Sequence, residues 1–408
     1  MAGKKQKSTN PAQWLLRFFS SFGLATVVLF LMCVVTLFGT LAQVEMGIYE
    51  AQKKYFESFF VVHWLGPVPG KGLPLPLPGG LLLMILLFIN LAVGTALKVR
   101  KKWKQPGLLI AHLGILFLLL GGFVTFKYST KGAMVLYEGQ TSDLFSSYHD
   151  WQIEVAKVVG ENEIGDHAFV IEKAQLKDMR PDEQRVFTSE DLPFDVVING
   201  YARNSMVLPA DIPIAQSSGS KEVDGYIVQP AALDPEAARN IPGAYVGVRS
   251  KSGGEEEEVI LWGFARHPAT VPVGDDEWTF QLIKERWKAP FEVKLDKFTH
   301  EYHPKTQIPR VYQSDVTKFE GDLEEEYEIS MNRPLRHEGY TFYQESWGPE
   351  GAQPGDQVWS QLAVSKNPAD QWPMWSCWVV GIGLLIHFLQ KLGGYLGRAQ
   401  RKGGAASA

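Results

Sequence analysis

The sequence predicts a membrane protein with four transmembrane α-helices and a large all-β extracytoplasmic domain, sandwich-like or barrel-like, inserted between the third and fourth helices. Four stretches are strongly apolar, and each has the length of about 20 residues that crosses a bilayer core. Between Lys127 and Pro373 the composition is that of a soluble protein. Short segments there are rich in β-branched and aromatic residues and bounded by turn residues, which is typical of antiparallel sheets. The mean hydropathy of −0.09 conceals this segregation.

The predicted organisation has nine parts. In chain order they are a cytoplasmic segment (1–21), a first span (22–42), an outer loop (43–78), a second span (79–99), a basic cytoplasmic turn (100–106), a third span (107–126), the β domain (127–373), a fourth span (374–392) and a cytoplasmic tail (393–408).

Basic residues orient the chain. Lys and Arg concentrate before the first span, in the turn Lys98–Lys104 and in the tail after Lys391. Because cytoplasmic loops carry the excess of Lys and Arg, both termini are predicted inside and the β domain outside. The first span is too long for a removable signal peptide and is predicted to be retained. The basic turn suits anionic lipid headgroups rather than nucleic acid.

The outer loop has two halves. Its first half is amphipathic and aromatic, whereas PVPGKGLPLPLPGG, residues 67–80, cannot continue a helix. We expect the loop to lie near the outer headgroups. Trp372, Trp375 and Trp378, where the chain re-enters the bilayer, are interpreted as an interfacial aromatic belt; a cofactor platform is the alternative.

Four segments illustrate the predicted strands: residues 132–139, 151–159, 194–202 and 257–265. The segment LPFDVVINGYARNS, residues 192–205, weakly matches APFEVKLDKFTHEY, residues 289–302. Either the β domain contains two similar modules or this match is chance. The acidic runs Glu255–Glu258 and Glu324–Glu326 are predicted to be solvated turns.

The two cysteines exclude several functions. Cys33 and Cys377 both lie in spans, so the chain has no CxxC of a thiol oxidoreductase and no CxxCH of a c-type cytochrome. Neither a phosphate-binding glycine loop nor a nucleophile triad is present in the sequence. We therefore assign no catalytic residue.

One histidine stands out by its position. His112 lies inside the third span, about 8 Å from its cytoplasmic end at the helical rise per residue. A polar group at this depth is costly unless it is paired or bound to a metal. His112 is therefore either a metal ligand or a donor to a carbonyl of a neighbouring helix. His387 in the fourth span is predicted at a similar depth, either as a second ligand or snorkelling toward water.

The other histidines are predicted outside: His63, His149, His167, His267, His300, His303 and His337. HEYH at 300–303 has ligand spacing but no third ligand nearby, so we expect a surface strand or loop rather than a zinc site. Arg333, Tyr340, Tyr343 and Gln344 either pack the β domain or hold an anionic group or a partner loop.

Four stretches together resemble the ResB (CcsB) family of system II cytochrome c biogenesis. They are FGTLAQ at the end of the first span, FINLAVGTALKVRKKW, AHLGILFLLLGG and the block ISMNRPLRHEGYTFYQESWG at 329–348. The resemblance implies a multi-pass protein of the bacterial inner membrane with a periplasmic domain. It also implies a ResC/CcsA-like partner, together with which the chain delivers haem to CxxCH apocytochromes.

This resemblance also implies a role for His112 as an axial ligand of haem b, shared with a histidine of the partner. The chain would then be a non-autonomous subunit of a haem lyase, with no metal other than haem iron. Two alternatives stay open. One is a b-type electron-transfer cytochrome that uses His112 and His387, and the other is a haem-free envelope scaffold or sensor.

Overall fold

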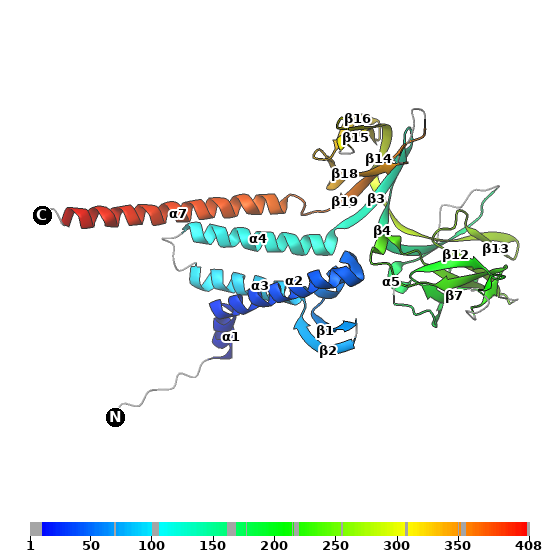
Figure 1. Ribbon diagram of the computed structural model, residues 1–408, viewed down its shortest axis with the longest axis horizontal. Coiled ribbons are helices and arrows are strands. Elements are labelled where there is room, and N and C mark those ends of the chain that lie inside the picture. Colours follow the sequence, from blue (N-terminus) through cyan, green and yellow to red (C-terminus); the bar gives the residue numbers. More distant parts are fainter. Residues whose placement is uncertain are drawn as a thin grey trace, which may run out of the picture. The chain divides into compact units, whose positions relative to one another are not determined.

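The computed structural model describes residues 10–68, 71–99, 106–160, 169–176, 178–213, 215, 220–253, 256–306, 309–349, 351 and 356–405. Outside these residues lie the lysines of the predicted cytoplasmic segment, Lys4, Lys5 and Lys7, residues 100–105 of the predicted basic turn, and His167. The chain forms two compact units (Figure 1). The helical unit consists of Met1–Thr130 and Asn367–Ala408, and the β unit consists of Lys131–Lys366.

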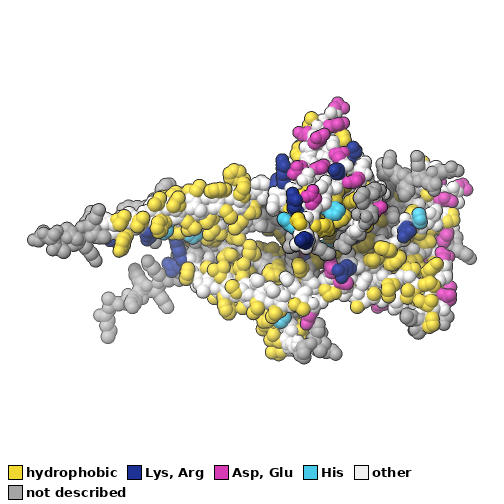
Figure 2. Space-filling model, turned by 45° about the horizontal axis from the view of Figure 1, so that its top comes forward, with side chains coloured by type: hydrophobic (Ala, Val, Ile, Leu, Met, Phe, Trp, Pro, Cys, Tyr) yellow, Lys and Arg dark blue, Asp and Glu magenta, His cyan; other side chains and the backbone are white. Residues whose placement is uncertain are grey.

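Long apolar helices make up most of the helical unit. They are α1 (Pro11–Phe19), α2 (Phe22–Ala51) with the π-helical turn η1 (Gln52–Phe56), α3 (Gly80–Gly94) with η2 (Thr95–Val99), α4 (Pro106–Tyr128) and α7 (Trp372–Ala405). Four of these, beginning at Phe22, Gly80, Pro106 and Trp372, are long and apolar enough to cross a membrane. Hydrophobic side chains dominate their visible surface in Figure 2. The prediction of four apolar helices is confirmed.

The first long helix extends past its predicted end at Ala42. It continues to Ala51 through a bend at Gly47, whose φ of 77° lies in the left-handed region that glycine adopts without strain. A hairpin of β1 (Phe60–Val68) and β2 (Lys71–Pro78) then leads to α3. The proline-rich half of the predicted outer loop is therefore a strand.

A polar contact inside the helical unit fixes the break between α1 and α2. The side-chain amide of Asn90, on α3, donates to the backbone oxygens of Phe19 at 2.7 Å and of Ser21 at 2.9 Å. The ammonium of Lys98 donates to the oxygen of Ser20. The last carbonyls of a helix have no partner within it, so these donors satisfy the end of α1.

In the β unit, the larger sheet runs in the order β16-β15-β14-β4-β3-β19-β18-β17, with β13 paired to β14 and β5 to β4. Its strands are β3 (Thr130–Tyr137), β4 (Thr141–Lys157), β5 (Phe169–Ile171), β13 (Ala269–Val273), β14 (Asp276–Tyr302), β15 (Pro309–Glu320), β16 (Leu323–Ser330), β17 (Leu335–His337), β18 (Tyr340–Gly348) and β19 (Trp359–Lys366).

The other strands form two smaller sheets, with orders β12-β11-β7-β6 and β8-β10-β9. They are β6 (Gln184–Phe187), β7 (Phe194–Ala202), β8 (Ser205–Pro209), β9 (Glu222–Val223), β10 (Tyr226–Pro230), β11 (Gly243–Ser250) and β12 (Glu257–Trp262). Two short helices, α5 (Lys173–Leu176) and η3 (Ala237–Arg239), interrupt them. The predicted large all-β domain is confirmed, and each of the four segments used to predict it contains a strand.

Two hydrophobic cores share the long strands β4 and β14. The first core contains Ile153 of β4 and Phe280 of β14, and the second contains Phe145 of β4 and Phe291 of β14. The two stretches that weakly match each other in sequence lie on different cores, 192–205 with the first and 289–302 with the second. Their origin by duplication stays a prediction.

The predicted turns in the two acidic runs are wrong for Glu257, Glu258 and Glu324–Glu326. Glu257 and Glu258 begin β12, and Glu324–Glu326 lie within β16. Both strands are at the edge of their sheet. Charged side chains on an edge strand discourage pairing with another chain, so an acidic run fits such a strand.

Candidate functional site

The functional candidate His112 lies on α4, which packs closely against α7 (Figure 1). Glycines make this contact. A Cβ added to Gly383 of α7 would lie 2.5 Å from the backbone nitrogen of Ala111, and one added to Gly114 of α4 would lie 2.7 Å from Val380. A Cβ on Gly107 would overlap the backbone nitrogen of His387. The two backbones therefore approach as in other small-residue helix pairs of membranes.

The ring of His112 is half-buried and held by its own helix. Its Nδ1 lies 2.7 Å from the carbonyl oxygen of Leu108, one turn earlier. A carbonyl only accepts, so Nδ1 must carry a proton. In the neutral ring Nε2 then keeps its lone pair, which is the form that ligates a metal. The predicted alternative of a bond to a neighbouring helix is replaced by this bond within α4.

His387 of α7 is offset from His112 along the packed helices. Its backbone is level with Gly107, which is five residues, or about 7 to 8 Å, along α4 from His112. Its Nδ1 is buried and has no hydrogen-bond partner among the described residues, so this atom does not reach water. The contact of Gly107 with the His387 backbone places the two helices too close for a macrocycle between them at this level.

The three tryptophans at the start of α7 separate into two environments. Trp372 stacks on Phe117 of α4, with ring centroids 5.1 Å apart, and it also covers Gly121. Trp375 and Trp378 are exposed, as an aromatic belt requires. Trp372 therefore belongs to the α4–α7 contact.

A third histidine of the helical unit is enclosed by aromatic rings. Nδ1 of His63, on β1, lies 2.6 Å from the hydroxyl of buried Tyr55, and its ring centroid is 4.2 Å from that of Phe38. Burial lowers the pKa of His63, Lys54 lowers it further, and Glu45 opposes them. Sequence reasoning missed this site because the contacts join α2, η1 and β1.

In the β unit, His300 belongs to an aromatic stack. Its ring lies 4.0 Å from that of Trp347 at an interplanar angle of 28°, and Phe298 stacks on the same tryptophan at 5.4 Å. Burial, with Tyr302 nearby, raises the pKa of Tyr312, which meets Phe298 edge-on, to about 12. His303 lies beyond the end of β14. The structure therefore places the HEYH segment on a strand and the loop after it.

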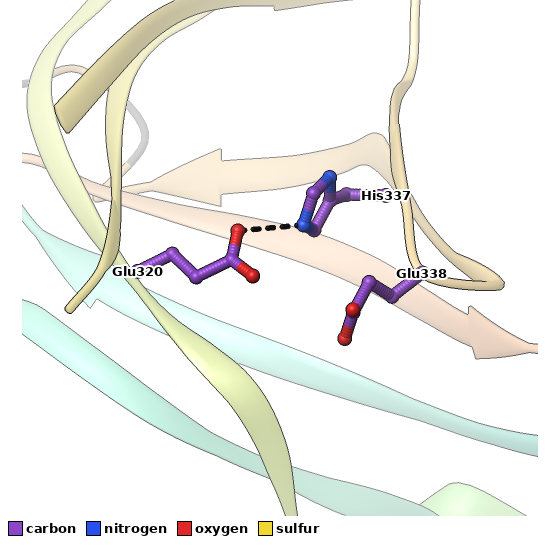
Figure 3. Close-up of side chains that lie close together, drawn as sticks. All are labelled: Glu320, His337 and Glu338. Atoms are coloured by element: carbon purple, nitrogen blue, oxygen red, sulfur yellow. Dashed lines mark ion pairs between the residues drawn. The ribbon is translucent and has the colours of Figure 1, made fainter. Parts of the chain in front are cut away.

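A charged cluster of the β unit has ligand-like spacing (Figure 3). Single ligand atoms of Glu320, His337 and Glu338 lie within 4.8 Å of one another, and Nε2 of His337 is 2.8 Å from Glu320. The fully buried Lys318 places its ammonium 3.1 Å from Glu320 and 3.3 Å from Nε2 of His337. This ammonium supplies the positive charge, so we assign the cluster to internal charge pairing rather than to a metal.

A cleft of about 790 Å³ borders this cluster. Its lining carries charges of both signs, including Glu338. Lys288 is paired with Asp143 at 2.9 Å, and the ammonium of Lys366 lies 4.9 Å from the ring centre of Tyr340. These charged groups mostly interact with neighbouring groups of the cleft itself, so we assign no ligand to it.

The family-like block at 329–348 mainly packs the sheet. The side chain of Gln344 accepts from Ser314 at 2.6 Å and donates to Ser360 at 3.0 Å, and both serines are fully buried. Tyr340 lies in the second core, and the exposed Arg333 pairs with Glu328 at 3.4 Å. These contacts support the packing role rather than the anion-binding one.

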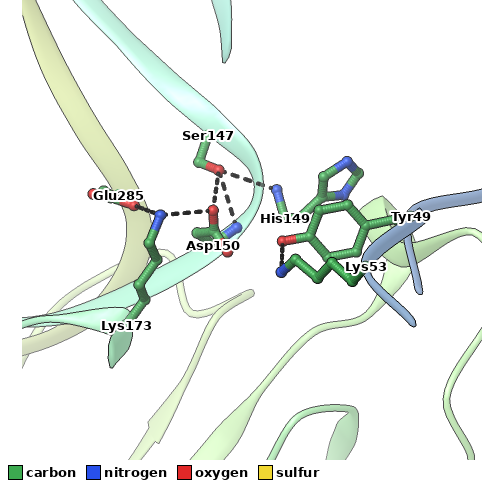
Figure 4. Close-up of polar contacts among 7 residues, drawn as sticks. All are labelled: Tyr49, Lys53, Ser147, His149, Asp150, Lys173 and Glu285. Atoms are coloured by element: carbon green, nitrogen blue, oxygen red, sulfur yellow. Dashed lines mark hydrogen bonds and ion pairs between the residues drawn. The ribbon is translucent and has the colours of Figure 1, made fainter. Parts of the chain in front are cut away.

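A bulge in β4 is fixed by hydrogen bonds (Figure 4). Ser147 accepts from the backbone nitrogen of Asp150 at 3.0 Å. Lys173 of α5 bridges Asp150 at 3.0 Å and Glu285 of β14 at 2.9 Å. Burial lowers the pKa of Lys173, but its two carboxylate partners outweigh burial and raise it. The bulge lies where the pairing of β4 with β14 shifts register, between the two cores.

Comparison with known proteins identifies relatives. Residues 261–357 match the ResB-like family. The cytochrome c biogenesis protein CcsB of Picosynechococcus sp. is 32% identical over 113 residues, which are 25% of this chain and 24% of that protein. CcsB of Microcystis aeruginosa is 30% identical over 129 residues, 27% of each chain. CcsB of Nostoc sp. is 29% identical over 128 residues, 27% of this chain and 26% of that protein.

The chain thus spans about a quarter of the length of these curated relatives. The family match extends from the end of β12 beyond β18 and includes Trp347 and Gln344. It also contains the whole block at 329–348 that carried the resemblance in the sequence. Residues 261–357 of the β unit are therefore similar to the ResB-like family, and about a quarter of the chain is similar to the CcsB proteins of cytochrome c biogenesis.

Proposed function

We propose that the chain is the ResB-like subunit of a membrane complex that delivers haem and joins it to CxxCH apocytochromes, together with a ResC/CcsA-like partner. The name of the CcsB relatives supports a role in cytochrome c biogenesis. The observation that carries the haem-binding part is the ring of His112. Its Nδ1–H donates to the carbonyl oxygen of Leu108, which leaves the lone pair of Nε2 suited to bind haem iron.

The four helices lie in the bacterial inner membrane in this proposal, with both termini in the cytoplasm and the β unit in the periplasm. The distribution of Lys and Arg supports this orientation. Lys98 lies in η2, the turn at the end of α3 that precedes α4 in the chain. It donates to the break between α1 and α2. His112 lies about 9 Å along α4 from its first residue, Pro106, at the helical rise per residue. Haem arriving from the cytoplasm would meet His112 first.

The second axial ligand comes from the partner. Glycine packing places the backbones of α4 and α7 in direct contact near Gly107, and His387 is offset along the axis from His112. A haem held between these two residues would have to separate the helices. The same packing argues against the alternative of a b-type cytochrome that uses His112 and His387.

No group of this chain is assigned to the covalent attachment of haem. The haem vinyl groups react with the cysteine thiols of the apocytochrome, and this chain holds and orients the haem that is passed on. The β unit provides a rigid surface for the partner and the apocytochrome. Its two cores and the fixed bulge of β4 support that positioning role.

The test is haem content, measured by absorbance and by the pyridine haemochrome assay. The full chain is purified with and without a co-expressed ResC/CcsA-like partner, as wild type and as His112→Ala. His303→Ala, an exposed position, is the matched control. We expect haem only with the partner, and its loss in His112→Ala but not in His303→Ala.

Equal haem in His112→Ala and wild type would remove the role assigned to His112. Haem in the isolated chain that depends on His387 would favour the b-type cytochrome, and no haem in any preparation would favour the scaffold.

A further inference from the structure

The β1–β2 hairpin has an apolar face that no other described part of the helical unit covers. We define the hairpin outer face by the alternating residues of the two strands: Phe60, Val62, Trp64, Pro74, Pro76 and Pro78. Phe60 is 75% exposed, Val62 44% and Trp64 39%. Antiparallel ribbons in water alternate between an apolar inner face and a polar outer face, and this hairpin does not.

The opposite face of the hairpin is the one that packs on the helices. Val61 and Leu77 oppose each other in the register and are buried in the core formed with α2 and α3. His63 stacks on Phe38 of α2 from the same face. The hairpin is therefore fixed by its inner face, and its apolar outer face is presented outward as a consequence.

The prolines of β2 occupy the positions that do not hydrogen-bond to β1. The nitrogen of Gly79 donates to the oxygen of Phe59 at 2.7 Å, so the odd-numbered residues of β2 direct their backbone groups toward β1. In an antiparallel pair the alternate residues direct theirs to the free edge. Those residues are Pro74, Pro76 and Pro78. Over this stretch the free edge of β2 therefore has no N–H donor.

A strand edge without donors suits a medium of low dielectric constant. Every unpaired backbone N–H carried into such a medium has an energetic cost, because it loses its hydrogen bonds to water without replacement. The prolines remove that cost at three successive edge positions. They also prevent another polypeptide strand from forming a regular ladder with β2, which argues against a protein strand as the occupant of this edge.

The position of the hairpin in the chain indicates the same medium. It joins the apolar helix that ends at Phe56 to the apolar helix that begins at Gly80. Both of its ends therefore lie where candidate membrane spans end. The indole of Trp64 prefers the boundary between hydrocarbon and headgroups, and the apolar ring of Phe60 suits the hydrocarbon side of it. Lys53 and Lys54, in the preceding turn, suit the phosphates there.

We propose that the hairpin outer face lies in the interfacial layer of the lipid bilayer, with the proline edge of β2 turned toward the hydrocarbon. The hairpin then anchors the outer ends of α2 and α3 and fixes the depth of His63. This inference rests on the proposed membrane location of the helices.

Site-directed nitroxide labelling of the full chain in phospholipid nanodiscs tests the inference. Val62→Cys is labelled in a background of Cys33→Ser and Cys377→Ser. The accessibility of the label to oxygen, which concentrates in lipid, is compared with that to a water-soluble nickel chelate. Val186→Cys on β6 is the matched control, because Val186 is 48% exposed and Val62 is 44% exposed. Leu37→Cys on the exposed side of α2 is the lipid-facing reference.

We expect the Val62 label to favour oxygen over the nickel chelate at least several-fold more than the Val186 label does, and less than the Leu37 label does. Equal accessibility of the Val62 and Val186 labels to nickel, with Leu37 in lipid, would overturn the inference and leave the membrane location intact. Nickel access at Leu37 as well would overturn the membrane location. Shielding of Val62 from both reagents only when the partner is present would make this face a protein-docking surface, and the inference would fail.

Discussion

The carbonyl oxygen of Leu108 accepts a hydrogen bond from Nδ1 of His112 across 2.7 Å, one helical turn apart. This contact fixes which ring nitrogen carries the proton, and it uses a carbonyl that already belongs to α4. The helix itself therefore leaves Nε2, the atom proposed to bind haem iron, free of the proton in the neutral ring. A preset tautomer reduces the reorganisation needed on binding a metal.

His112→Gly should lose haem in the partner complex by more than about 10-fold, since even changes to groups that only hydrogen-bond to a metal ligand cost about 10–100-fold. Free imidazole added during purification should restore part of the haem, because it can supply the missing nitrogen from within the vacated space. The measurement is the haem-to-protein ratio and the absorbance spectrum. His387→Gly serves as control and should neither lose haem nor respond to imidazole. Failure of imidazole to restore haem in His112→Gly, with the complex still assembled, would count against direct ligation.

Gly383→Ala should separate α4 from α7, because the new Cβ would lie 2.5 Å from the backbone nitrogen of Ala111. Overpacking of this kind costs about 1 to 3 kcal/mol. Gly381→Ala is the control, two residues away on the same helix, where a Cβ meets no atom within 4 Å. It should be neutral or stabilising, since alanine favours helix by about 1 kcal/mol over glycine. Thermal unfolding in detergent compares them, and equal stability of the two variants would show that the α4–α7 contact is looser.

The cluster around Lys318 predicts acid sensitivity of β15 and β16. Hydrogen bonds from Lys318 lower the pKa of Glu320 and of Glu325 below their ordinary value of 4.5. A carboxylate with a depressed folded-state pKa contributes stability above its unfolded pKa, and the contribution is lost as the pH falls through the folded-state value. We therefore expect hydrogen exchange in these strands to accelerate as the pH drops below about 4.5, after correction for intrinsic exchange.

Lys318→Met should abolish this extra acid dependence, because it removes the cation that holds both carboxylates ionised. Lys157→Met is the control. The ion pair of Lys157 with Asp276, at 2.7 Å, is exposed and lies in another part of the sheet. It should leave the pH profile of β15 and β16 unchanged. An identical profile in Lys318→Met would mean that other groups govern the acid response.

Hydropathy and strand propensity were sufficient for the four helices and the β domain, because each depends on local composition. The strand β2 was missed because proline disfavours strands. Prolines are compatible with this strand only because Pro74, Pro76 and Pro78 direct their backbone groups to its free edge. The burial of Lys318 was predictable in principle. In the segment VTKFE, Lys318 lies two residues after buried Val316 and therefore on the same face of the strand. A lysine in a strand is normally expected to be exposed, even at such a position. His63 depended on contacts between separate elements, which a sequence does not show.

Asn90→Ala should destabilise the helical unit more than Asn10→Ala does. Asn90 is buried and donates to the part-buried oxygens of Phe19 and Ser21, so its removal takes a donor from both, at a cost of about 1 to 3 kcal/mol. Asn10 is exposed and accepts from the nitrogen of Ala12 at 3.2 Å as the N-cap of α1, which is typically worth about 1 kcal/mol. Thermal unfolding in nanodiscs, combined with protease access to the α1–α2 break, measures both. Because Asn90 binds the junction itself, its loss should also open Ser20 and Ser21 to cleavage, whereas loss of the Asn10 cap should fray only the first turn of α1. Equal cleavage in both variants would show that Lys98 alone holds the junction.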